Sequence, residues 1–223
     1  MGKRSKTLQG ANLELQEIEP LTQNQLRAFE SDKNMVLHGV AGTGKTFIAC
    51  YFAFDDMIKG EYDKLVLIRS AVPTRDIGFL PGTEKEKASV YEEPYKDITS
   101  DLFERGDAYS ILKQKFTVEF MTTSFIRGIT IDNAVILIDE CQNMTFHELD
   151  SIITRVGTNC RVIFCGDFRQ DDFSGKRENS GLQDFFKILN KTDRFKMIDF
   201  QIEDIIRSDL VKDYIIAKHE LGF

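Results

Sequence analysis

The sequence predicts an α/β domain with a mostly parallel sheet flanked by helices, and three features predict it. Short apolar runs rich in Val, Ile and Phe alternate with amphipathic stretches, which is typical of strands joined by crossover helices. A glycine-rich loop stands between one such run and the helix-like stretch after it. The length of 223 residues, with 42% hydrophobic and 29% charged residues, suits one full domain with a buried core.

Each element follows from its local pattern. The predicted strands are the short apolar runs 35–38, 65–69, 117–121, 135–138, 162–165 and 196–200. The predicted helices are the amphipathic stretches 24–30, 45–58, 94–105, 146–155, 181–189 and 210–221. Residues 71–95 contain three prolines and are predicted to form a long loop, of the kind that is usually functional or disordered. Residues 1–19 show no clear period and are interpreted as a flexible tail or a short docking segment before one domain over 20–223.

The most specific motif is a match to G-x-x-x-x-G-K-[ST] between a predicted strand and a predicted helix. Glycines let such a P-loop curl, so that backbone N–H groups and the helix N-terminus surround phosphate oxygens. Lys45 is expected to neutralise the β- and γ-phosphates of a nucleotide, and the Thr46 hydroxyl to hold Mg²⁺. The predicted nucleotide-binding residues are Gly39, Val40, Ala41, Gly42, Thr43, Gly44, Lys45 and Thr46.

Two adjacent carboxylates, Asp139 and Glu140, follow the apolar run 135–138. An α/β fold binds its ligand at the carboxyl ends of its strands. Asp139 suits Mg²⁺ binding through water, and Glu140 suits polarisation of the water that attacks the γ-phosphate. Adjacent acids are also common as solvated turn residues, but the P-loop upstream favours the catalytic interpretation.

A third apolar run, 162–165, leads into Gly166 and on to Gln170. In P-loop ATPases with a separate catalytic glutamate, an extra strand lies between the P-loop strand and the acidic strand. That arrangement predicts that Gln170 faces the γ-phosphate, where its amide can bond the transferred group. Gly-Asp at a strand end is otherwise an ordinary turn.

Composition restricts the other possibilities. The longest apolar run, 47–54, has 8 residues, far fewer than the about 20 that a membrane-spanning helix needs. The basic opening is followed by no apolar signal core, so we expect a cytoplasmic protein. The four cysteines are scattered without a C-x-x-C pair and are expected to be reduced. A net charge of −7 argues against coating of nucleic acid by the whole surface but leaves room for one basic groove.

These motifs in this order resemble the superfamily 1 helicase core, and more closely the PhoH-like family of phosphate-starvation-inducible ATPases over about residues 20–217. The resemblance also rests on the segments 77–82, 125–128, 139–143, 154–157, 180–182 and 204–207. It implies a single RecA-like P-loop NTPase domain that uses ATP and Mg²⁺. Cys141 stands where the family usually has Ala, and 171–173 is more acidic than is usual there.

The resemblance carries expectations about base and substrate recognition. By similarity to the Q-motif of such helicases, Gln25 is expected to read adenine through its amide, with a helix-surface glutamine as the alternative. Single-stranded RNA or DNA is the implied partner, bound along the carboxyl ends of the strands. The segment 69–75 would touch its backbone, with Lys85, Lys87 and Tyr91 nearby.

One RecA-like domain fits in the chain, whereas a superfamily 1 motor holds ATP between two. We therefore predict a homo-oligomer, with the hexameric ring of PhoH relatives as the suggested form. A neighbouring subunit would then supply an arginine in trans, a contribution worth about 10³–10⁵ in rate. Arg207 is the first candidate because it lies in a family-like element, and Arg155 and Arg127 are the alternatives. For each of these arginines, an ordinary ion pair at the surface remains the alternative role.

The predicted function is an ATP-hydrolysing, helicase-like ATPase that acts on single-stranded RNA or DNA. Its predicted catalytic residues are Lys45, Glu140, Gln170 and Arg207. A nucleotide-gated scaffold that hydrolyses ATP slowly would use the same residues and stays open. A P-loop small-molecule kinase is disfavoured, since it has no use for Glu140 beside Asp139 or for the stretch that ends at Gln170.

Overall fold

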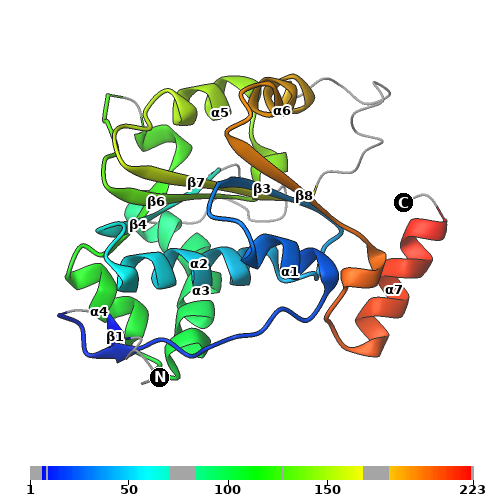
Figure 1. Cartoon of the computed structure of the whole chain (residues 1–223), viewed down its shortest axis with the longest axis horizontal. Coiled ribbons are helices and arrows are strands. Elements are labelled where there is room, and N and C mark those ends of the chain that lie inside the picture. Colours follow the sequence, from blue (N-terminus) through cyan, green and yellow to red (C-terminus); the bar gives the residue numbers. More distant parts are fainter. Residues whose placement is uncertain (1–6, 9, 71–83, 127, 168–180, 222–223) are drawn as a thin grey trace.

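The computed structural model describes residues 7–8, 10–70, 84–126, 128–167 and 181–221. Six strands form one sheet in which every neighbouring pair is parallel (Figure 1). In their order across the sheet they are β5 (Val118–Thr122), β4 (Lys64–Arg69), β6 (Ala134–Asp139), β7 (Cys160–Gly166), β3 (Asn34–Gly39) and β8 (Phe195–Phe200). All six correspond to predicted strands, and the predicted fold class is confirmed.

Helices cover both faces of this sheet (Figure 1). On one face lie α1 (Gln23–Phe29), α2 (Lys45–Lys59), α3 (Glu84–Phe103) and α4 (Ala108–Gln114). On the other face lie α5 (Phe146–Ile153) and α6 (Leu182–Lys191), and α7 (Asp209–Glu220) packs beyond the β8 edge. Short 3-10 turns follow three of the strands, at Thr123–Phe125, Cys141–Asn143 and Ile202–Asp204. None of the helices in the described part of the chain is long and apolar enough to span a bilayer.

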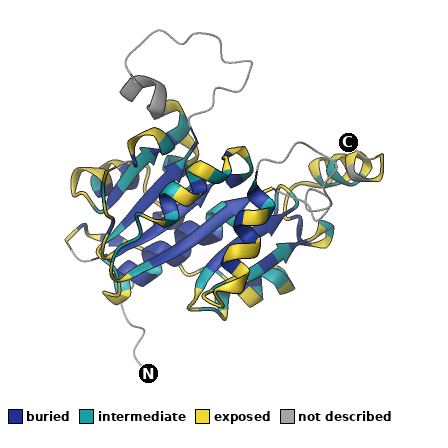
Figure 2. Cartoon of the chain, turned by 90° about the horizontal axis from the view of Figure 1, so that it is seen from above, coloured by how far each residue is buried: buried dark blue, intermediate teal, exposed yellow. Residues whose placement is uncertain are grey.

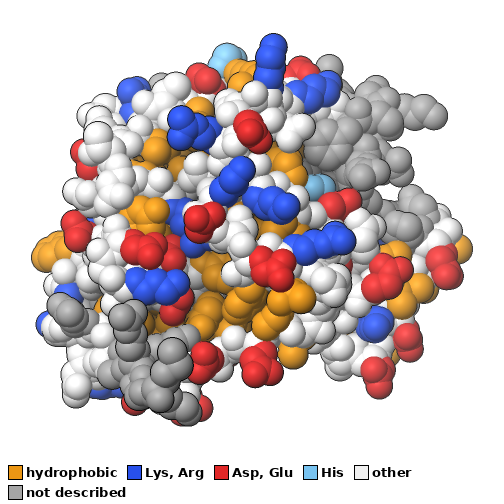
Figure 3. All heavy atoms as spheres, viewed as in Figure 1, with side chains coloured by type: hydrophobic (Ala, Val, Ile, Leu, Met, Phe, Trp, Pro, Cys, Tyr) orange, Lys and Arg blue, Asp and Glu red, His pale blue; other side chains and the backbone are white. Residues whose placement is uncertain are grey.

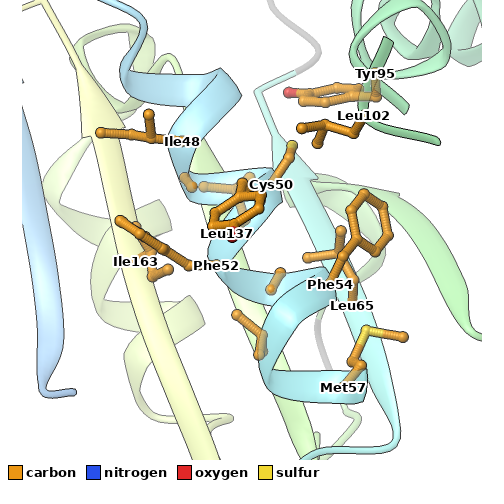
Figure 4. Close-up of a cluster of buried hydrophobic side chains, with 14 of the residues drawn as sticks. Ile48, Cys50, Phe52, Phe54, Met57, Leu65, Tyr95, Leu102, Leu137 and Ile163 are labelled. Carbon is orange, nitrogen blue, oxygen red and sulfur yellow. The ribbon is translucent and has the colours of Figure 1, made fainter. Parts of the chain in front are cut away.

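The central strands are almost wholly apolar because both sides of the sheet are covered, whereas the edge strands β5 and β8 carry Glu119, Lys196 and Asp199. Successive side chains alternate between two cores: Met35 and Leu37 of β3 pack with α2, whereas Val36 joins the core under α5 and α6. The strands are accordingly the most deeply buried part of the chain (Figure 2). Figure 4 shows the α2 side of this arrangement, where α2, α3 and the strands share one cluster.

Two helices differ from the prediction. α3 begins at Glu84, ten residues before the predicted start, and continues through Pro94. Proline costs a helix one hydrogen bond, but Tyr95, Leu102 and Phe103 are buried and hold α3 against the domain. α4 was not predicted at all, because its 7 residues are too few for a helical pattern of apolar residues to be recognised.

The described part of residues 1–19 packs against the domain. β1 (Thr7–Leu8) and β2 (Leu13–Glu14) pair antiparallel, and the side chains of Leu8, Leu13 and Leu15 are buried in the same core as α2. The Gln16 N–H also donates to the Leu102 carbonyl at 2.8 Å. The buried leucines lie on either side of a turn and show no regular period, so the sequence left a tail and a docking segment as alternatives; the described contacts are those of a docked segment.

Candidate nucleotide-binding and catalytic site

The P-loop runs from the end of β3 into the first turn of α2. Gly39 has φ +112°, and a Cβ built on it would lie 2.1 Å from the Phe200 carbonyl oxygen, so only glycine fits. The Val40 N–H donates to that same carbonyl at 3.0 Å. The loop is thus tied to β8, the neighbouring strand, and α2 begins at Lys45 with its N-terminal N–H groups at the loop.

Two segments distant in the sequence support the P-loop from the other side. Gln25 of α1 donates from Nε2 to the Thr43 carbonyl at 3.0 Å, and its Oε1 accepts from the Leu21 N–H at 2.8 Å. The Ile206 N–H donates to the Gly42 carbonyl at 3.1 Å. Gln25 is 2% exposed, so it is not a surface glutamine, and both of its amide atoms contact backbone. Its contact with adenine stays a prediction.

Lys45 lies over the loop that precedes it. Its Nζ donates to the carbonyls of Gly39 at 2.9 Å and Val40 at 2.7 Å. Burial lowers the pKa of Lys45, whereas nearby negative charge, above all that of Asp167, acts to raise it. A partly desolvated cation in the first turn of α2, close to the free N–H groups of the helix N-terminus, is suited to phosphate oxygens.

Asp139, the last residue of β6, is held by two hydroxyls. The Thr46 hydroxyl donates to Oδ1 at 2.9 Å, and the Tyr95 hydroxyl donates to Oδ2 at 2.8 Å. Burial raises the pKa of Asp139 and the Glu140 charge adds to this, while the two hydrogen bonds act in the opposite direction. The Thr46 and Asp139 oxygens at the end of the P-loop are the hard donors that Mg²⁺ prefers, so these residues fit that ion.

Glu140 has an unusual backbone and two polar neighbours. Its φ of +52° lies in the left-handed region, which costs a non-glycine residue about 1–2 kcal/mol. The Gln142 amide donates to Glu140 Oε2 at 2.5 Å, and Arg69 Nη2 lies 3.9 Å from Oε1. Strained residues of this kind cluster at functional sites, so the conformation agrees with a catalytic role for Glu140.

These groups line one cleft of about 590 Å³ at the carboxyl edge of the sheet. That volume is in the range of ligand pockets. The cleft brings together most of the predicted site, because its lining includes residues 41–46, Asp139, Glu140 and Arg207. Gln170 lies outside the described residues, although Asp167, just after β7, lines the cleft.

Arg207 belongs to the cleft of its own chain. A Cβ on Gly42 would lie 2.9 Å from Arg207 Cγ, so the arginine stem packs on the P-loop. The fold returns the segment after β8 to the P-loop of the same chain. That Arg207 acts on a neighbouring subunit stays a prediction. Arg155 lies at the opposite edge of the sheet, where its carbonyl accepts from the Ile131 N–H at 2.9 Å. Arg127 is outside the described residues.

The predicted nucleic-acid segment is described only in part. Arg69 ends β4 beside Asp139, and its guanidinium carbon lies 5.8 Å from the centre of the Tyr91 ring. Residues 71–83 are outside the described residues, and Lys85 and Lys87 are described only as part of α3.

Two site residues had no assigned role in the sequence. Tyr95 contacts Asp139, and Gln142 joins Glu140 to the Asp167 N–H, which donates to Gln142 Oε1 at 3.0 Å. Gln142 was visible only as part of a family-like segment. For Tyr95 the available signal was the helical spacing of Tyr95, Ile98 and Leu102, in a segment that the prolines made resemble a loop.

A P-loop strand, an acidic strand and a strand inserted between them in a parallel sheet define the RecA-like class of P-loop ATPase. The family described as "PhoH-like protein" matches residues 17–218. This chain therefore belongs to the PhoH-like family.

Similar proteins agree with this membership. A PhoH-like protein of Mycobacterium leprae (strain TN) is 31% identical over 214 residues, covering 92% of this chain and 61% of the relative. One of Bacillus subtilis (strain 168) is 34% identical over 180 residues, covering 80% and 56%. The chain thus spans about three fifths of the length of these relatives. A solved structure, "Sulfolobus solfataricus SWI2/SNF2 ATPase core in complex with dsDNA", is 14% identical with a TM-score of 0.48 over 82% of this chain and 47% of its own.

Proposed function

We propose that this chain binds ATP with Mg²⁺ in the cleft and hydrolyses the γ-phosphate. The supporting observation is convergence: Lys45, the Thr46–Asp139 pair and Glu140 come from separate segments and line one cleft beside a helix N-terminus. A motif that formed only a flexible glycine loop would not need a strained glutamate and a buried carboxylate facing it.

Each residue has a distinct role in this proposal. P-loop N–H groups and Lys45 bind the phosphates. Thr46 and Asp139 hold Mg²⁺, which when bound neutralises charge on the β- and γ-phosphates. Glu140 accepts the proton of the attacking water, and Arg207 supplies positive charge beside the loop. Gln170 would bond the transferred group.

Substitutions of Glu140 and of Lys45 should affect different steps of the reaction. Glu140→Gln should bind ATP normally but lose about 10²–10⁴-fold in turnover, because an amide of the same shape cannot accept the proton. Lys45→Ala should weaken ATP binding itself, because it removes the cation from the phosphates. Equilibrium binding and phosphate release, measured on both variants, separate the two effects. Wild-type turnover in Glu140→Gln would contradict the role given to Glu140.

We further propose that single-stranded RNA or DNA is the substrate on which the ATPase acts. Acidic and basic side chains are interspersed on the face shown in Figure 3, which is unlike the basic area that a polynucleotide backbone requires. Arg69 lies at the carboxyl edge of the sheet beside the cleft, so we place the binding of the single strand at that edge instead. Turnover is therefore compared without polynucleotide and with single-stranded RNA, single-stranded DNA and duplex.

The same measurement separates the competing functions. Stimulation by a single strand supports the helicase-like motor. Slow turnover that no polynucleotide changes favours a nucleotide-gated scaffold. Phosphate found on a small acceptor would identify a kinase, for which the pairing of Glu140 with Asp139 gives no support.

Self-assembly is part of this proposal. The chain has one P-loop domain over the family match, whereas an arginine from a second domain commonly completes such a site. α7 and the residue after it expose apolar side chains on one side, with Leu210 80%, Tyr214 68% and Leu221 72% exposed. Figure 2 shows that α7 projects from the domain, where this surface is available to another copy. A homo-oligomeric ring, hexameric as the family suggests, is the proposed form.

A further inference from the structure

Helix α3 reaches the metal-binding carboxylate through one buried tyrosine. Tyr95 is 1% exposed and its hydroxyl donates to Asp139 Oδ2 at 2.8 Å. Thr46 occupies the other carboxylate oxygen, Oδ1. Asp139 is thus fixed from two sides by two helices, α2 and α3, and the direction of its carboxylate plane is set between them.

The Tyr95 side chain is well placed to keep this role. Figure 4 shows Tyr95 and Leu102 projecting from α3 toward α2, on the same side of the buried cluster as Cys50. The Thr99 hydroxyl donates to the Tyr95 carbonyl at 2.6 Å and adds a local bond within this turn of α3.

The preceding turn of α3 is connected to the carboxylate of Glu140 through Arg69. Tyr91 lies four residues before Tyr95, so both face the same side of the helix. Arg69 lies between the Tyr91 ring, 5.8 Å from its guanidinium carbon, and Glu140 Oε1, 3.9 Å from Nη2. One helix therefore contacts Asp139 directly and Glu140 through an arginine.

We propose that α3 positions the acidic pair: Tyr95 orients Asp139 toward Mg²⁺ through its hydroxyl, and Tyr91 orients Arg69 beside Glu140 through its ring. This inference rests on the proposed ATPase function. Groups that bond a metal ligand fix its orientation, and their loss typically costs about 10–100-fold in metal affinity or activity. The alternative is that Asp139 merely satisfies a buried hydroxyl of the core.

The test compares Tyr95→Phe with a matched control. A fluorescent ATP analogue is titrated in EDTA and at rising Mg²⁺ concentration, so that binding is measured without turnover. Tyr95→Phe should bind the analogue in EDTA as the wild type does, but should need about tenfold more Mg²⁺ for the metal-dependent gain in affinity. The control is Tyr109→Phe on α4. It removes a buried hydroxyl that donates to Glu92 Oε2 of α3 at 3.0 Å, and neither residue lines the cleft.

Position 91 gives a second, independent result. Tyr91→Phe keeps the ring over Arg69 and should retain wild-type turnover, whereas Tyr91→Leu removes the ring and should lower kcat several-fold with the Mg²⁺ midpoint unchanged. The hydroxyl thus matters at 95, and the ring matters at 91.

The outcomes are distinguishable. A wild-type Mg²⁺ midpoint in Tyr95→Phe, or an equal shift in Tyr109→Phe, would overturn the role of Tyr95 while leaving the ATPase proposal intact. Equal kcat values for the Phe and Leu variants at 91 would overturn the role of Tyr91. A wild-type protein that binds no nucleotide would overturn the ATPase proposal and this inference together.

Discussion

At the scale of single residues, Gln25 is a buried amide that supports the P-loop from a separate helix. Its two hydrogen bonds connect the start of α1 to the P-loop backbone at Thr43. Asp204 strengthens the same joint, because the Asn24 amide donates to its Oδ2 at 2.7 Å. Gln25 thus joins the segment before β3 to the P-loop, and Asn24 joins the same segment to the one after β8.

Gln25→Ala should therefore lower the affinities for ATP and GTP by the same factor. The loss should be about fivefold, because the one hydrogen bond from Gln25 to the P-loop, worth roughly 1 kcal/mol, is removed and that loop binds phosphates common to both nucleotides. Competition binding with both nucleotides measures it. Gln23→Ala, at an exposed glutamine of the same helix, is the control. A loss confined to ATP would instead support the prediction that Gln25 reads adenine.

At the residue scale, the sequence indicated the position of site residues that belong to contiguous motifs. The P-loop and the Asp139–Glu140 pair are contiguous motifs, and each lies in the cleft as expected. Tyr95 is 44 residues from Asp139, and Gln142 acts by joining the ends of two strands. Such contacts form only when the sheet brings the strand ends together, so no local sequence pattern predicts them.

At the scale of elements, β7 is held at its start by a buried ion pair. Arg161 Nη1 lies 2.6 Å from Asp56 Oδ2 of α2, and the side chains are 6% and 5% exposed. Arg161 Nη2 also donates to the Ser31 carbonyl at 2.7 Å. Burial raises the pKa of Asp56 despite the facing Arg161, so the pair is costly to bury and more costly to break.

Arg161→Ala should lower the free energy of unfolding by about 3–5 kcal/mol, since it leaves the Asp56 carboxylate buried without its cation. Denaturant unfolding followed by circular dichroism measures the change. Lys59→Ala is the control: Lys59 also lies near Asp56 but its side chain is 54% exposed, so its removal should cost less than about 1 kcal/mol. An equal loss in both variants would show that burial does not determine the strength of this pair.

Elements were predictable where periodicity is long and apolar. The six strands are near-continuous apolar runs because helices cover both faces of the sheet, and each was recognised on that basis. α3 and α4 were missed or shortened because their helical state depends on burial. Only Ala108, Tyr109 and Leu112 of α4 are buried, and they pack on a core that the sequence alone does not display.

At the scale of the whole molecule, the sheet order matches the expectation of an extra strand between the P-loop strand and the acidic strand, since β7 lies between β3 and β6. The return of the chain after β8 was not predictable from the sequence.

This return places Ile206 and Arg207 on the P-loop of the same chain, so one arginine is already present in cis. Arg155, at the opposite edge of the sheet, is too far from its own cleft to contact it and is the described alternative for a contribution in trans.

Mixing experiments distinguish these two positions. Lys45→Ala and Arg155→Ala chains, each poorly active, should regain activity when mixed, because some interfaces join an intact P-loop from one chain to an intact Arg155 from the other. Lys45→Ala mixed with Arg207→Ala should regain none, because Arg207 serves only the P-loop of its own chain. Specific activity of the wild type should also fall on dilution, as subunits separate by mass action. Recovery in the Arg207 mixture would return that residue to a role in trans, and a wild-type monomer with undiminished turnover would contradict assembly itself.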